Sequence, residues 1–152
     1  MCQAENNGQS GEFRTLTGYR DAEKKRITSA MEDYLEMIFR MAADGAPVRA
    51  GDLARRLHVT PSSATKMITN LAECGCVDAA RYGYVTLTEY GRCVGEYLMT
   101  RHDTVHRFFC LLNGTESELE QTEKVEHFIL PRTLIAMEQF LAEHAKVSEE
   151  RN

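Results

Sequence analysis

The chain has 152 residues, which is enough for a hydrophobic core and for one domain or two small ones. Its formal net charge of −5 argues against indiscriminate binding of nucleic acid, but the charge is unevenly distributed. Residues 49–81 hold five cations and three anions, whereas residues 102–152 hold ten acids and five bases. A locally basic segment on an acidic body is typical of a protein that binds DNA with one part and has another task in the other.

The five cysteines are an odd number without a CxxC pair, so they predict neither a disulfide framework nor a zinc ribbon. No apolar run approaches the roughly 20 residues that a membrane span needs, and no signal peptide is visible. We therefore expect a cytoplasmic protein that does not contact a membrane.

Residues 1–27 are polar and lack a sustained apolar period, which predicts a flexible N-terminal extension. Ser29 and Glu32 then have the spacing of a capping box and predict a helix that Gly45 ends. The core side of this helix is Met31, Tyr34, Leu35, Ile38 and Ala42. Asp33 and Glu36 lie one turn apart on a neighbouring face. That face is either an ordinary solvated acidic surface or part of a metal site.

Residues 49–88 predict a winged helix-turn-helix. A short helix at 52–57 and a tight link at 58–60 lead to Thr60 and Pro61, a hydroxyl N-cap followed by proline at the first helical position. The apolar residues of the second helix recur at i, i+3, i+4 and i+7, which predicts one buried face. The β-branched and aromatic stretch 76–88 predicts two strands that turn at Tyr82 and Gly83 and form a wing.

The opposite face of the second helix offers short hydrogen-bonding side chains and one cation, which suit phosphates and base edges. The predicted DNA-binding residues are Ser62, Ser63, Thr65, Lys66 and Asn70, together with Arg49, Arg81 and Tyr82 on phosphates. Two short helices joined by a tight turn also occur in structural bundles, which is the alternative interpretation.

A long helix is predicted from the Thr88 cap to about Leu112, with His102 on its apolar stripe, where a histidine is either a core residue or a ligand. The next predicted helix, 116–130, places Glu123 and Glu126 in one row with Leu119 and Leu130, and His127 lies beside the row. If that row faces inward, its carboxylates need a cation or a metal, because unpaired buried charge is costly. Pro131 begins a last amphipathic helix.

Three helices therefore offer hard donors, namely Asp33, Glu36, His102, Glu123, Glu126 and His127. Carboxylate oxygens with one or two imidazoles suit Mn(II) and tolerate Fe(II), Co(II) or Zn(II), and the large Cd(II) ion also fits. Each motif is weak alone, and it is their occurrence beside a DNA-binding module that indicates a metal-responsive regulator.

The segments MEDYLEMIF, VRAGDLARRLHVTPSSATKMITNL, GYVTLTEYG, RHDTVHRFF and VEHFIL resemble the diphtheria-toxin-repressor family of metal-dependent transcriptional regulators. Within it the manganese transport regulator branch is the closer fit, since all six donors above match the ligand types of that branch. In the iron-responsive branch the position of Asp33 is a methionine and that of Glu123 a cysteine. The resemblance spans about residues 28–141.

The resemblance implies a mainly α fold: a winged helix-turn-helix DNA-binding domain at 28–90 and a helical metal-binding and dimerisation domain at 91–152. It implies a repressor of metal-uptake genes that binds a palindromic DNA operator as a homodimer, activated most readily by Mn(II), and not an enzyme. An iron- or zinc-responsive member of the family is the alternative. A metallohydrolase and a winged-helix sensor of an organic ligand are rivals from other classes, and no small-molecule substrate is expected.

Overall fold

The computed structural model describes residues 27–45, 47–79 and 83–149, which group into two compact units, one up to Glu96 and one from Tyr97 onward. The boundary falls within the long helix α5 (Glu89–Asn113). Residues 1–26 of the predicted N-terminal extension lie outside the described residues.

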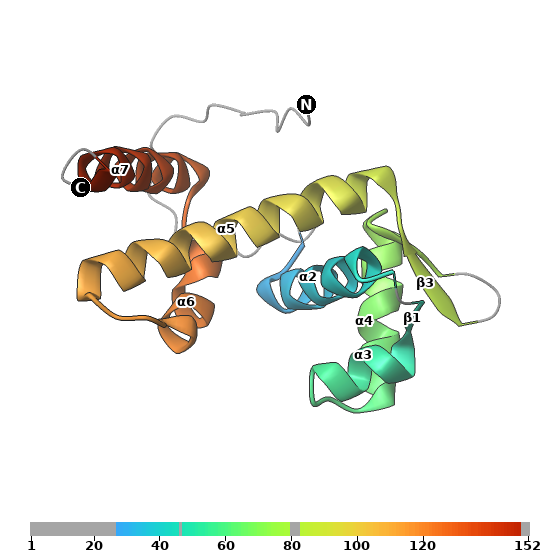
Figure 1. Cartoon of the computed structure of the whole chain (residues 1–152). Coiled ribbons are helices and arrows are strands. Elements are labelled where there is room, and N and C mark those ends of the chain that lie inside the picture. Colours follow the sequence, from blue (N-terminus) through green and yellow to red (C-terminus); the bar gives the residue numbers. More distant parts are fainter. Residues whose placement is uncertain (1–26, 46, 80–82, 150–152) are drawn as a thin grey trace, which may run out of the picture. The chain divides into compact units, whose positions relative to one another are not determined.

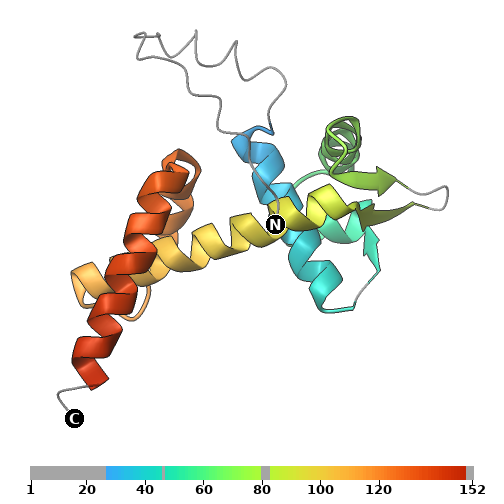
Figure 2. The ribbon, with the colours of Figure 1, turned by 90° about the horizontal axis from the view of Figure 1, so that it is seen from above.

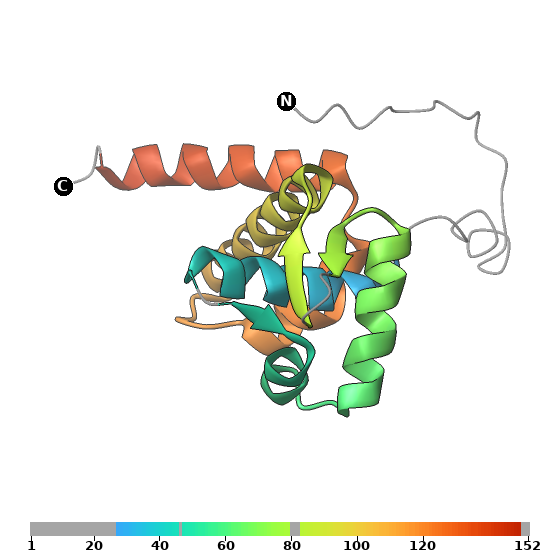
Figure 3. The same ribbon diagram turned by 90° about the vertical axis from the view of Figure 1, so that its right-hand side faces the viewer.

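The first unit is a winged helix-turn-helix. Its elements are α2 (Ser29–Ala43), β1 (Val48–Arg49), α3 (Ala50–Arg56), α4 (Pro61–Glu73), β2 (Val77–Ala79), β3 (Tyr84–Leu87) and the first turns of α5 (Figure 1). The strands form an antiparallel sheet in the order β1-β3-β2. The core lies where α2, α3 and α4 meet, and it is filled by Leu35, Ile38, Leu53, Ala64 and Leu71. Figure 3 shows α4 beside the hairpin of β2 and β3, and α4 contacts β2.

Most helix starts follow the predicted caps. The Thr60 hydroxyl accepts the Ser63 N–H at 3.2 Å with Pro61 at the first helical position, and the Thr88 hydroxyl accepts the Gly91 N–H at 2.9 Å. The predicted cap at Ser29 is wrong by one residue. Thr28 is the N-cap of α2, and its hydroxyl accepts the Met31 N–H at 3.3 Å. Either hydroxyl could reach an N–H three residues on, so the sequence alone did not separate them.

Strand β1 was not predicted, because two residues are too short to leave a period in the sequence. It pairs with β3, and the register places Val48 opposite Val85 and Arg49 opposite Tyr84. The wing strands were predicted, and they pair with Val77 opposite Leu87. The predicted turn at Tyr82 lies outside the described residues, whereas Gly83 has φ +76°, a left-handed conformation that favours glycine.

The start of α5 packs tightly on the first unit through two glycines. A Cβ on Gly91 would lie 1.8 Å from the Cys76 carbonyl oxygen, and one on Gly95 would lie 2.6 Å from the Phe39 ring. Only a residue without a side chain lets the helix approach this closely.

The second unit holds the rest of α5, then α6 (Leu119–Val125), the 3₁₀ turn η1 (Glu126–Phe128) and α7 (Pro131–Glu149). Helices α6 and α7 lie on opposite sides of this part of α5 (Figures 1 and 3). Buried Leu134 and Leu141 line the inner face of α7, and the Phe140 ring meets the Phe108 ring edge-on at 5.6 Å between centroids.

The prediction of one continuous helix over 116–130 is wrong. Helix α6 ends at Val125, a single 3₁₀ turn follows, and Ile129 is extended. The predicted row of Leu119, Glu123, Glu126 and Leu130 therefore does not form a buried face, and of the four only Glu126 is buried. Thr122, which the row omitted, is fully buried in its place.

Candidate DNA interface and metal site

The polar face of α4 is open to solvent. Ser62, Ser63, Thr65 and Lys66 are exposed, and Asn70 is half-buried. The apolar face of the same helix is buried at Ala64, Ile68 and Leu71. The helix therefore has the predicted buried apolar face and an exposed polar face opposite it.

A network of hydroxyls surrounds the start of α4. The Thr60 hydroxyl lies 3.0 Å from the Ser62 hydroxyl and 2.8 Å from that of Ser63, and the Thr65 hydroxyl donates to the Pro61 carbonyl at 2.9 Å. Because its proton is committed to that carbonyl, the Thr65 hydroxyl faces a ligand as an acceptor or through its methyl group. The Thr60 hydroxyl has a single proton, so at least one of the two serine hydroxyls donates to it.

Arg49 is held by a partner that the sequence analysis missed. Its guanidinium donates to the Tyr84 hydroxyl and lies over the Tyr84 ring, with 4.3 Å between the guanidinium carbon and the ring centroid. The stacking fixes a cation beside the wing, and it depends on the β1–β3 register, which no local sequence signal reveals. Arg81 and Tyr82, the other predicted phosphate contacts, lie outside the described residues.

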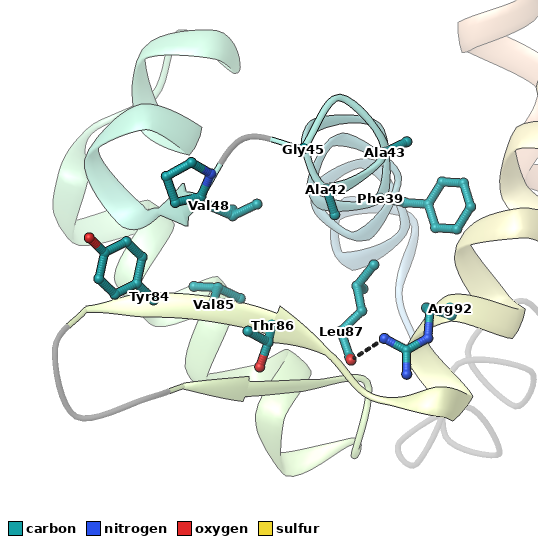
Figure 4. A pocket seen from close by; sticks show the side chains of 11 residues that line it. Phe39, Ala42, Ala43, Gly45, Val48, Tyr84, Val85, Thr86, Leu87 and Arg92 are labelled. Atoms are coloured by element: carbon teal, nitrogen blue, oxygen red, sulfur yellow. Dashed lines mark hydrogen bonds between the residues drawn. The ribbon is translucent and has the colours of Figure 1, made fainter.

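An apolar hollow of about 610 Å³ lies beside the wing (Figure 4). Phe39 and Ala42 of α2 face Val85 and Leu87 of β3 across it, and Arg92 closes one end, where it donates to the Leu87 carbonyl at 3.0 Å. Its lining is mainly apolar and contains no carboxylate, imidazole or thiol, so it is not built to hold a metal ion.

Two of the six predicted metal ligands lie in the first unit, on α2. Asp33 is exposed and Glu36 is half-buried, three residues apart and therefore on one side of the helix. Arg40 donates to Glu36 from Nε at 3.1 Å and from Nη2 at 2.7 Å, and both bonds end on Oε1. The second carboxylate oxygen of Glu36 takes no part in this ion pair.

The second unit brings two of the predicted ligands together. His102 Nδ1 lies 3.1 Å from Glu126 Oε2, and the two residues are only 9% and 3% exposed. With the carboxylate ionised, Nδ1–H is the donor and the lone pair of the imidazole lies on Nε2. The contact keeps an imidazole and a carboxylate, two donor types that bind divalent metal ions, side by side in the interior of the unit. His102 also shares the buried stripe of α5 with Leu98 and Val105, as predicted.

His127 is bound differently. The Arg101 guanidinium, which the sequence analysis missed, lies with Nη2 3.2 Å from His127 Nδ1. An arginine can only donate, so Nδ1 is the acceptor and, in a neutral ring, the proton lies on Nε2. A metal held through Nδ1 would displace Arg101, and one held through Nε2 would require the other tautomer. Either way, this contact and a metal on His127 exclude each other.

Glu123 is exposed on α6, one turn before Glu126. The predicted ligands thus include a buried pair, His102 and Glu126, and surface carboxylates that water can reach. Oxygen donors predominate, and no thiolate is among them, which is the donor chemistry that hard divalent cations prefer.

Known proteins resemble this chain over its DNA-binding unit and beyond it. Residues 26–85 match the family described as "Iron dependent repressor, N-terminal DNA binding domain". Over 103 residues, which are 67% of this chain and 74% of the relative, the sequence is 33% identical to the HTH-type transcriptional regulator MntR of Lysinibacillus sphaericus (strain C3-41). The chain belongs to the diphtheria-toxin-repressor family. Within this family of metal-dependent transcriptional regulators it is MntR-like.

Solved structures agree with this family fold. The manganese regulator SloR matches with a TM-score of 0.66 at 22% identity, over 74% of this chain and 53% of that one. ScaR with bound Zn²⁺ matches with a TM-score of 0.64 at 21% identity, over 74% of this chain and 53% of that one. The chain thus spans about half the length of these two family members. Among the described residues, no helix is both long enough and apolar enough to cross a membrane.

Proposed function

We propose that the chain is a Mn(II)-activated repressor of metal-uptake genes that binds a palindromic operator as a homodimer. The observation that supports this most is the buried His102–Glu126 pair, which lies in the same chain as the exposed, Lys66-bearing face of α4. The similarity to MntR of Lysinibacillus sphaericus adds manganese to this proposal, as does the name of SloR, the manganese regulator. The physiological site of action is proposed to be the cytoplasm.

The proposed ligands are Asp33, Glu36, His102, Glu123, Glu126 and His127. Mn(II), when bound, supplies two positive charges that neutralise clustered carboxylates. His102 and Glu126 already lie within hydrogen-bond distance of each other, and Arg40 holds Glu36 by one oxygen and leaves the other for the ion. Metal on His127 would release Arg101, so the metal-free and metal-bound states differ in which cation faces that ring.

The proposed consequence of binding is that α2, which the DNA-binding unit carries, becomes tied to α5 and α6. In a dimer, such a tie fixes the spacing of two α4 helices, and a two-fold protein then matches a two-fold operator. Metal and DNA must raise each other's affinity by the same factor, typically about 5- to 150-fold. Ser62, Ser63, Thr65, Lys66 and Asn70 would face the DNA, with Arg49, Arg81 and Tyr82 on phosphates.

The proposed dimer surface lies on η1 and α7. Phe128 is 81% exposed, Ile135 54% and Phe140 40%. Several large apolar side chains exposed on one small unit indicate a surface that another protein covers, and a second copy of the chain is the simplest occupant.

Operator binding tests the metal site. A duplex is first selected from a random library in the presence of Mn(II), and its affinity is then measured by fluorescence anisotropy as Mn(II) is added. Glu123→Ala should abolish the gain in affinity that Mn(II) gives, and Glu120→Ala should not. Glu120 is the matched control because it is an exposed carboxylate on the same helix that pairs with Lys124. An intact Mn(II) response in Glu123→Ala would show that the proposed ligand set is wrong.

A series of metals tests the identity of the ion. Mn(II) lies low in the general affinity order, so selectivity must come from hard ligands and coordination number. We expect Mn(II) and Cd(II) to activate operator binding, and Zn(II), which four ligands satisfy, to bind and activate poorly. The double variant Asp33→Met, Glu123→Cys should respond less to Mn(II) relative to Fe(II) or Co(II). Equal activation of the unmodified protein by Zn(II) and Mn(II) would favour the zinc-responsive alternative.

The rivals from other classes give different results in the same assay. A metallohydrolase would bind Mn(II) without a change in DNA affinity. A sensor of an organic ligand would respond to a compound in the apolar hollow between α2 and β3 and not to metal.

A further inference from the structure

The two ends of the α6 segment are held by two histidines of one helix. His102 and His106 are one turn apart on α5, and their rings are parallel, with 6.5 Å between centroids and 6° between planes. His102 Nδ1 bonds the Glu126 carboxylate after the last residue of α6, and His106 Nε2 accepts the backbone N–H of Glu118, the residue before its first. The first contact joins two of the proposed metal ligands, whereas the second involves neither a ligand side chain nor a ligand backbone.

Glu118 is the centre of the turn that leads into α6. Its carboxylate accepts the Asn113 amide at 3.1 Å and the Thr115 hydroxyl at 2.7 Å. Its carbonyl accepts both the N–H of Thr122 at 2.9 Å and the hydroxyl of Thr122 at 2.8 Å, and Thr122 is fully buried. These contacts lie within the turn and the start of α6. The bond from the Glu118 N–H to His106, in contrast, joins the turn to α5.

Helix α6 needs such an anchor. It has only seven residues, and its N-cap has no side-chain hydrogen bond, so its position depends on tertiary contacts. Three of the six proposed metal ligands depend on its position, since Glu123 lies on α6 and Glu126 and His127 lie on the turn after it. A shift of its start would move Glu123 directly.

We propose that His106 is a positioning residue that anchors the start of α6 and thereby sets the position of Glu123 for metal. The inference rests on the proposed function, because it assigns a role to His106 through the ligands that α6 carries. His106 is not itself a ligand, since its Nε2 lone pair already accepts a backbone N–H, and the Cys110 thiol lies 3.6 Å from the same nitrogen. On this proposal His102 binds the metal, and His106 holds the segment that carries the other ligands.

Three variants of the full chain test this role. His106→Met keeps the size of the side chain and removes the strong acceptor, whereas His106→Gln retains an acceptor at similar reach. His144→Met is the control, since it removes an exposed imidazole from α7. Mn(II) binding is measured by the loss of the free Mn(II) signal in electron paramagnetic resonance, and the folding of each metal-free variant is checked by urea unfolding in chelator.

Loss of one hydrogen bond should weaken Mn(II) binding of His106→Met by about three- to tenfold, with no change in the number of ions bound. His106→Gln should restore most of the affinity, and His144→Met should not change it. Equal affinity in His106→Met and the unmodified chain would overturn the anchor and leave the proposed function standing. If the unmodified chain binds no Mn(II), the proposed function fails, and the anchor fails with it.

A second measurement does not depend on any variant folding. In the metal-free unmodified chain, the Glu118 amide should exchange its hydrogen at least about tenfold more slowly than the amide of exposed Glu116 in the same turn. Equal exchange of the two amides would show that the His106 bond does not persist in solution and would overturn the proposal.

Discussion

Lys66 provides the sharpest test of how the DNA-binding unit works. It is exposed on the polar face of α4, between the exposed hydroxyls near the helix start and half-buried Asn70. A lysine there has the reach of a phosphate contact and lacks the planar fork that reads guanine. Lys66→Ala should therefore weaken binding to all DNA sequences alike.

The size of the effect follows from counterion release. Each phosphate that a protein neutralises adds about 0.9 to the slope of log K against log salt. The proposed homodimer carries two copies of Lys66, so Lys66→Ala should reduce that slope by about 1.8. Between about 50 and 200 mM salt, a fourfold change, the ratio of the two affinities should then change by about tenfold.

The assay is fluorescence anisotropy with the selected operator and an unrelated duplex over a range of salt concentrations, with Mn(II) present throughout. Lys124→Ala is the matched control, because it removes an exposed cation from α6 in the other unit. An unchanged salt slope in Lys66→Ala together with a changed sequence preference would refute the reasoning, since it would mean that Lys66 reads bases.

The remaining predictions concern folding and assembly. Gly91→Ala should lower the free energy of unfolding by about 3 kcal/mol, because the added Cβ would collide with the Cys76 carbonyl. Gly51→Ala is the control: its Cβ would meet nothing within 4 Å, so it should raise the free energy of unfolding slightly. Urea unfolding measures both values. Burial and neighbouring Cys74 raise the pKa of the Cys76 thiol from 9.0 to about 11. The folded state therefore holds this proton more tightly, so the contribution of the thiol to stability is full below pH 9.0 and is lost as pH rises toward about 11. The urea midpoint should fall over that range, and less so in Cys76→Ala; an equal fall in both would contradict the assignment. Phe128→Glu should convert the proposed dimer into a monomer in sedimentation at micromolar concentration, and an unmodified chain that is already monomeric with and without metal would exclude the dimer.

The winged helix-turn-helix could be predicted because its signals are local. Thr60 and Pro61 start α4 as expected, and the apolar period of that helix reports its buried face without reference to the rest of the chain. The buried face of α5, which carries Leu98, His102 and Val105, could be predicted for the same reason. Elements whose capping and amphipathicity agree are those that sequence patterns describe best.

The break after Val125 could not be predicted in this way. No glycine or proline precedes Pro131 in that stretch, so helical periodicity continues in the sequence after the helix itself has ended. In the structure, Glu126 is buried against His102, and Ile129 is extended. A tertiary contact thus coincides with the end of the helix. Of the row predicted to face inward, Leu119, Glu123 and Leu130 are exposed in the structure.

The partners of the predicted site residues were also beyond the sequence. Tyr84 stacks with Arg49 only because β1 and β3 pair in one register, and Arg101 meets His127 from a different helix. The residue types of the site could be recognised from the chain, whereas the groups that orient them depend on contacts between distant segments.

The measurement that tests the central claim most directly is anomalous scattering at the manganese edge from crystals grown with Mn(II). We expect a peak contacted by His102 and Glu126 and also by Asp33 or Glu36 of α2. The matched control is a crystal of Glu126→Gln, in which the peak should be weak or absent. A strong peak that touches neither α2 carboxylate, or one that persists in Glu126→Gln, would contradict the claim that metal joins the DNA-binding unit to the helices that follow it.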